Sequence, residues 1–128
     1  MIPDINMVRE KALAKAKNAN ESNGKLDLIF KTINHFYDEL SAYMNDQLRG
    51  GSFASCKLEY WAIRGYMQNT LRVELDNDEY FEILDAIFNK IQMEYTSAGY
   101  TVFVKKVVGT QINFCAYYES YYRCQIRF

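Results

Sequence analysis

The chain has 128 residues, of which 49% are hydrophobic and 16% aromatic, and its 15 basic and 16 acidic residues give a formal net charge of −1. This length and apolar content suffice for one buried core without disulfides or metal, and they exclude an intrinsically disordered chain. The balanced net charge gives no overall argument for a nucleic-acid or membrane partner.

The three cysteines, Cys56, Cys115 and Cys124, are odd in number and show no CxxC spacing. Such usage is typical of free thiols in a reducing compartment. No charged-then-apolar signal segment opens the sequence, and no run approaches the roughly 18 apolar residues that span a bilayer. These features predict a cytoplasmic protein with no membrane partner.

Two helices are predicted before residue 50. Pro3 and Asp4 open the first, whose alanine-rich stripe extends to about Asn20. Helix-breaking residues then predict a short turn: Asn18, Asn20, Asn23 and Gly24. A longer helix follows over about 25–48, and its apolar side consists of Ile29, Ile33, Phe36, Tyr37, Leu40, Tyr43, Met44 and Leu48. The pattern predicts a helical hairpin over residues 1–49.

Gly50 and Gly51 predict an internal connection between this hairpin and an α+β core over residues 53–128. Because residues 1–49 alone would have a thin core, the two parts are predicted to form one domain, 1–128.

The segment after the connection is the most ambiguous in the chain. Residues 57–67 fit either a strand or one face of a short helix, and we favour a strand that turns near Arg64 and Gly65. Residues 69–75 alternate between apolar and polar side chains, which predicts a second strand there. The two strands would form a hairpin.

Residues 76–104 carry the clearest pattern in the chain. Asp76 and Glu79 have the spacing of a capping box, in which each side chain bonds the other residue's backbone N–H. The following apolar residues recur at helical spacing and predict a core-facing stripe: Tyr80, Leu84, Ile87, Phe88, Ile91, Tyr95 and Ala98. Gly99 is suited to the left-handed conformation that ends a helix, and the β-branched and aromatic run after it predicts a strand over 100–107.

Residues 112–128 alternate cleanly between apolar and polar positions, and the run is predicted to break or bend near Glu119 and Ser120. One parity predicts a core face: Ile112, Phe114, Ala116, Tyr118, Tyr122, Cys124, Ile126 and Phe128. A single strand of this length would exceed a small domain, so the run is either a hairpin or a bent strand. The whole pattern predicts an α+β fold in which an antiparallel β-β-α-β-β sheet, with one more strand as an alternative, packs on helices.

No catalytic or metal-binding residue is predicted. His35, the only histidine, lies off the apolar stripe of its helix and has no nucleophile in a recognisable local motif. The acidic residues around Asp76 lack the spacing of a calcium loop, and no phosphate-binding glycine motif occurs. The chain is therefore predicted to need no cofactor and to be non-enzymatic, although an enzyme or small-ligand site built from distant residues stays an alternative.

The other parity of the C-terminal run offers a candidate binding surface. Tyrosine and arginine are enriched at binding hot spots, and a basic, aromatic sheet face can also bind nucleic acid. The candidate residues are Tyr117, Tyr121, Arg123, Gln125 and Arg127, with Lys105 and Lys106 nearby in the sequence. They favour a macromolecule-binding or regulatory protein with a protein partner or self-association, and nucleic acid as the alternative. In composition the chain is similar to many accessory proteins of phages and mobile elements, a likeness that no motif carries.

Overall fold

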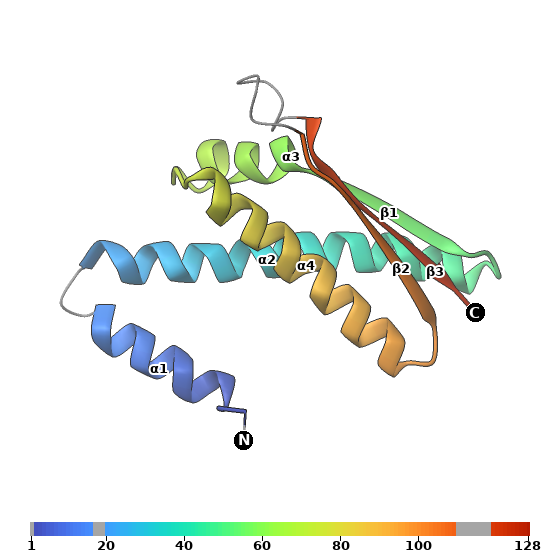
Figure 1. Ribbon diagram of the computed structural model, residues 1–128, viewed down its shortest axis with the longest axis horizontal. Coiled ribbons are helices and arrows are strands. Elements are labelled where there is room, and N and C mark those ends of the chain that lie inside the picture. The colour runs from blue at the N-terminus through green and yellow to red at the C-terminus, as the bar shows by residue number, and fades with distance from the viewer. Residues whose placement is uncertain (1, 17–19, 110–118) are drawn as a thin grey trace. The chain divides into compact units, whose positions relative to one another are not determined.

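The computed structural model describes the backbone of residues 2–16, 20–109 and 119–128, and their side chains except those of 12–23. In chain order the elements are α1 (Ile5–Ala16), α2 (Asn20–Arg49), β1 (Ala54–Glu59), α3 (Tyr60–Gly65), the π-helical turn η1 (Tyr66–Thr70), α4 (Asn77–Ser97), β2 (Thr101–Val107) and β3 (Tyr121–Arg127) (Figure 1). The predicted α+β class is confirmed. The chain groups into two compact units, Met1–Lys31 and Thr32–Phe128.

The first unit contains α1 and the first turns of α2. Its two helical segments contact each other where the Arg9 guanidinium lies 4.2 Å from the centre of the Phe30 ring. None of the helices in the described residues is both long and apolar enough to cross a bilayer.

The predicted turn at Asn20, Asn23 and Gly24 is wrong. Asn20, Asn23 and Gly24 lie inside α2, which begins five residues before the predicted start near Lys25. Asparagine and glycine weaken a helix interior by only about 1 kcal/mol or less relative to alanine, so the rest of a 30-residue helix can outweigh them. Asn18 lies outside the described residues.

The second unit is built on a three-stranded antiparallel sheet of order β1-β3-β2. β3 is therefore central, with Cys124 opposite Cys56 on one side and Val104 on the other. Along β3 the predicted alternation is confirmed, because Tyr122, Cys124 and Ile126 are buried and the residues between them are partly or fully exposed.

The predicted alternation of buried and exposed residues does not extend to the last residue. Phe128 lies beyond the end of β3 and is 71% exposed, contrary to its predicted place in the core. Residues 112–118, on which the choice between hairpin and bent strand depends, lie outside the described part of the chain.

Helix α4 follows the predicted plan closely. Asp76 Oδ1 accepts a hydrogen bond from the Glu79 backbone N–H at 2.8 Å, and Glu79 Oε1 accepts one from the Asp76 N–H at 3.3 Å, which completes the capping box. Gly99 has a φ of +98° after the helix, as predicted. The buried side chains of α4 are Tyr80, Ile83, Leu84, Ile87, Phe88, Ile91 and Tyr95.

The predicted stripe of α4 thus differs at two positions. Ile83 is buried although it was not part of the predicted stripe, and Ala98 is exposed because it lies past the end of the helix. The helix packs on the sheet face that carries Tyr122, whose ring centre is 5.5 Å from that of Phe88.

The predicted hairpin over 57–75 is wrong, because only residues 57–59 of its first strand lie in β1 and its second strand is absent. The chain leaves β1 at Glu59 and enters α3, so Gly65 is helical rather than part of a turn. Residues 69–75 form no strand, and Arg72 has a positive φ of 59° that interrupts extended backbone. Backbone groups here bond locally instead, with the Val73 N–H donating to Met67 O at 2.9 Å. Burial does alternate along residues 71–75. Such alternation shows that one side of an extended segment is covered, but it does not show that the segment pairs with another strand.

In the second unit, α2 lies beside the outer edge of β1. The Ser55 backbone N–H, which β3 does not use, donates to Gln47 Oε1 at 2.9 Å. Gly51, with a φ of +81°, closes the short turn between these elements. Of the predicted apolar side of α2, Phe36 and Met44 are buried, but Tyr43 is 58% exposed.

Candidate functional site

One face of the sheet is covered by α4, and the other carries most of the predicted binding residues. We call this second side the open face. Directly opposite residues of neighbouring strands project to the same side of a sheet, so the register defines its members. They are Ser55, Lys57 and Glu59 of β1, Thr101, Phe103, Lys105 and Val107 of β2, and Tyr121, Arg123, Gln125 and Arg127 of β3.

Three positive charges cross the open face in one row. Arg123 is directly opposite Lys57 on β1 and directly opposite Lys105 on β2, and all three side chains are exposed. Facing residues in an antiparallel pair have Cβ atoms only about 4.5–5.5 Å apart, and like charges placed there repel. The Lys57 ammonium is 3.6 Å from Glu59 Oε1, which offsets part of this charge.

Aromatic rings lie on both sides of the row, towards the two ends of the open face. The Lys57 Nζ is 4.3 Å and the Arg123 Cζ 5.6 Å from the centre of the Tyr121 ring. At the other end, the Arg127 guanidinium lies 5.7 Å from the ring of Phe53, just before β1, and 5.2 Å from that of Phe103. Cations and rings therefore alternate across the face.

The open face is hollowed next to α2. A depression of about 540 Å³ is lined by Tyr43, Ser55, Cys56, Lys57, Arg123, Cys124 and Gln125. Tyr43 was predicted to be a core residue of α2, and it is exposed at this depression instead. Tyr43 thus lines the depression together with two cations of the row, Lys57 and Arg123.

The structure brings five of the seven predicted site residues together on this face: Tyr121, Arg123, Gln125, Arg127 and Lys105. Gln125 is half-buried, and its Oε1 accepts a hydrogen bond from Arg127 Nη2 at 2.9 Å. Tyr117 lies outside the described residues.

Lys106 belongs to the opposite side of the sheet. It is paired in register with the buried Tyr122, and its ammonium lies 2.7 Å from Asp85 Oδ1 on α4. The Tyr122 hydroxyl donates to the same carboxylate oxygen at 2.8 Å, and burial, with this hydrogen bond, raises the pKa of Tyr122. Lys106 therefore links β2 to α4 through an ion pair.

Lys57 and Phe103 of the open face, and Phe53 just before β1, are among the residues that sequence reasoning missed. Ala54, Cys56 and Leu58 share one parity of β1, so their alternation would have assigned Lys57 to the wet face. Phe103 shares the parity of Lys105 in β2. No sequence signal gives the register that puts Lys57 opposite Arg123, because the two residues are far apart in the chain.

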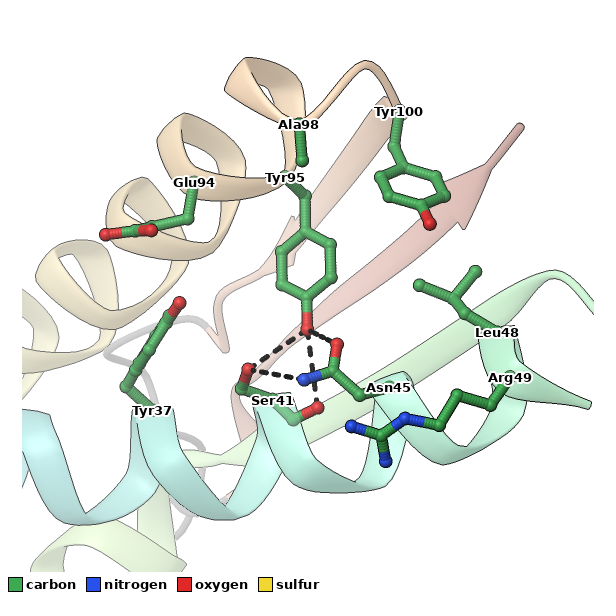
Figure 2. A pocket seen from close by; sticks show the side chains of 9 residues that line it. All are labelled: Tyr37, Ser41, Asn45, Leu48, Arg49, Glu94, Tyr95, Ala98 and Tyr100. Atoms are coloured by element: carbon green, nitrogen blue, oxygen red, sulfur yellow. Dashed lines mark hydrogen bonds between the residues drawn. The ribbon is translucent and has the colours of Figure 1, made fainter.

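A second hollow, of about 420 Å³, lies between α2 and α4 (Figure 2). The hydroxyl of Tyr95 points at α2, where it donates to Asn45 Oδ1 at 2.6 Å and lies 3.0 Å from Ser41 Oγ. Tyr37 and Tyr100 line the same hollow. Burial raises the pKa of both Tyr37 and Tyr95. The hydrogen bonds of Tyr95 with Ser41 and Asn45 link α4 to α2, so these polar groups have a structural role.

Among the described residues, Cys56, Cys124 and His35 have structural partners, whereas Cys115 lies outside them. Cys56 and Cys124 are buried opposite each other, and their hydrogen bond, with burial, raises the pKa of the Cys56 thiol. His35 stacks on Tyr66 with ring centres 4.4 Å apart, and its Nε2 is 3.5 Å from Glu39 Oε1. Within the described residues, no three His, Cys, Asp or Glu side chains gather as a metal site would require.

Comparisons of the chain with protein-family models, with curated proteins and with solved structures find no match. The geometry of the open face is therefore the basis for assigning a function.

Proposed function

We propose that this chain is a non-enzymatic binding protein whose open face takes an anionic macromolecule. The observation that carries the proposal is the cation row of Lys57, Arg123 and Lys105 across all three strands. Placing like charges opposite each other lowers the stability of a sheet, and a ligand with several negative charges would remove that repulsion.

Self-association through this face is the weaker candidate. A two-fold symmetric contact places the same patch of each copy against itself, so the cation rows of two copies would meet. With Glu59 as the only acidic residue on the open face of the described strands, such a contact would have few opposite charges to pair. A partner of opposite charge fits the face better than a second copy does.

Heparin affinity chromatography of the full-length protein tests the proposal, because heparin supplies dense negative charge without bases or peptide groups. We expect the protein to bind at low salt and to elute as salt rises. The double variant Arg123→Glu/Arg127→Glu should pass through unbound, with an unchanged circular dichroism spectrum.

The matched control is Arg49→Glu/Lys90→Glu, which changes the net charge equally at two helical positions outside the open face. It should elute close to the wild-type position. Failure of the wild type to bind heparin at low salt, or equal losses in both double variants, would refute a role for the open face.

A further inference from the structure

We infer that the anionic partner is a single-stranded nucleic acid, an inference that rests on the proposed function of the open face. An acidic peptide such as polyglutamate could satisfy the cations, but it has no flat π-face to stack on the exposed rings of this face. Phe103 is 51% exposed and stands two residues from Lys105 on the same strand. Bases have flat π-faces that stack on such rings while neighbouring phosphates contact the cations.

The Arg127 end of the face has the geometry of a stacking platform. The guanidinium lies between the rings of Phe53 and Phe103, and Phe53 also meets Phe128 with ring centres 4.9 Å apart. Arginine planes and aromatic rings are the two side-chain surfaces on which unpaired bases stack. At the other end, Tyr121 and the depression beside Tyr43 place further rings next to Lys57 and Arg123.

A single strand fits this face better than a duplex does. Bases in a duplex are stacked on each other and reach a protein only by their edges, whereas bases of a single strand can splay onto a sheet. Three strands about 4.8 Å apart and six or seven residues long offer room for about three or four nucleotides. In RNA-recognition domains, aromatic side chains on one face of a four-stranded sheet stack two or three bases.

The test measures fluorescence anisotropy of labelled probes with the full-length protein. The probes are an oligodeoxythymidylate and an oligouridylate of about 12 nucleotides, a duplex of the same length, and a polyglutamate peptide of similar charge. We expect both single strands to bind at least about tenfold more tightly than the peptide or the duplex, since stacking on one ring contributes roughly 5- to 150-fold.

Three ring variants separate stacking from charge. Phe103→Ala should weaken oligonucleotide binding by roughly 5- to 150-fold and change peptide binding less than about twofold. Phe103→Leu keeps an apolar side chain at this exposed position but has no π-face, and it should give the same selective loss. Tyr43→Leu should weaken oligonucleotide binding in the same direction.

Salt dependence supplies a second readout. In a plot of log affinity against log salt, Lys105→Ala should make the slope shallower by about 0.7, the value of one phosphate contact on a single strand. Lys106→Ala, its neighbour on the covered side, should leave the slope unchanged.

The outcomes distinguish this inference from the proposed function. If polyglutamate or the duplex binds as tightly as the single strands, or if both Phe103 variants lose affinity equally for all probes, nucleic-acid recognition is wrong and anion binding stands. If no anionic probe binds, both are wrong.

Discussion

Replacing Lys105 or Lys106 with glutamine removes one positive charge from adjacent residues of β2 that project to opposite sides of the sheet. The two substitutions are chemically identical, but the surroundings differ. Lys105 faces Arg123 across the open face, whereas Lys106 is paired with Asp85 at 2.7 Å. We expect them to change the free energy of unfolding in opposite directions at low salt.

The magnitudes follow from the geometry. Cross-strand Cβ atoms about 5 Å apart put the charged ends of Lys105 and Arg123 about 7 Å apart, where two unit charges in water repel by about 0.6 kcal/mol. Lys105→Gln should therefore stabilise the protein by about that amount. Exposed ion pairs contribute about 0.2–1 kcal/mol, so Lys106→Gln should destabilise it by about 0.5 kcal/mol. The two variants should differ by about 1 kcal/mol.

Urea denaturation followed by circular dichroism measures this difference, since urea leaves the ionic strength free to vary. The screening length falls from about 30 Å at about 0.01 M salt to about 3 Å at about 1 M, where the repulsion drops to roughly a tenth. The two variants should therefore approach each other at high salt. A destabilising Lys105→Gln at low salt, or a difference that salt does not reduce, would refute the repulsive cation row.

Three further predictions concern the scaffold. Asp76→Ala removes the N-cap of α4 and should lower the free energy of unfolding in urea by about 1 kcal/mol, whereas Asp78→Ala, which is not the N-cap, should cost less. Ile87→Ala empties a fully buried position and should cost about 2–5 kcal/mol in the same assay. Because the pKa of Tyr122 is raised, its contribution to stability is complete below the unfolded value of about 10 and is lost as pH rises through the folded value. Tyr122→Phe should therefore show a shallower fall in stability above about pH 10, measured by urea denaturation across pH. An equal fall in both proteins would contradict this account.

The elements that sequence predicted best are those with several agreeing local signals. Helix α4 has a capping box, a helical apolar period and a glycine with positive φ after its end, and each is independent of the rest of the fold. The alternation along β3 was also readable, because one side of a half-covered strand must be apolar.

The errors come from features that depend on distant parts of the chain. Residues 69–75 have the alternation of a strand but pair with no strand of the described part of the chain, and periodicity alone cannot predict pairing. Tyr43 has helical spacing with Phe36 and Leu40, yet it lies beside the depression at the open face instead of in the core. The cation row needed the register of β1 with β3, which is a tertiary property.

Strand alternation also explains how a small protein can hold a binding surface without weakening its core. Along β3, Tyr122, Cys124 and Ile126 are packed under α4, and each is followed by a residue of the open face. Substitutions on the open face therefore leave the core contacts intact, and the repulsion among its cations lowers stability only while no anion is bound. Because binding removes that repulsion, the ligand should stabilise the folded chain by more than its contacts alone, and the additional stabilisation should fade as salt rises. The same charges would thus set both the affinity for the partner and the stability of the free protein.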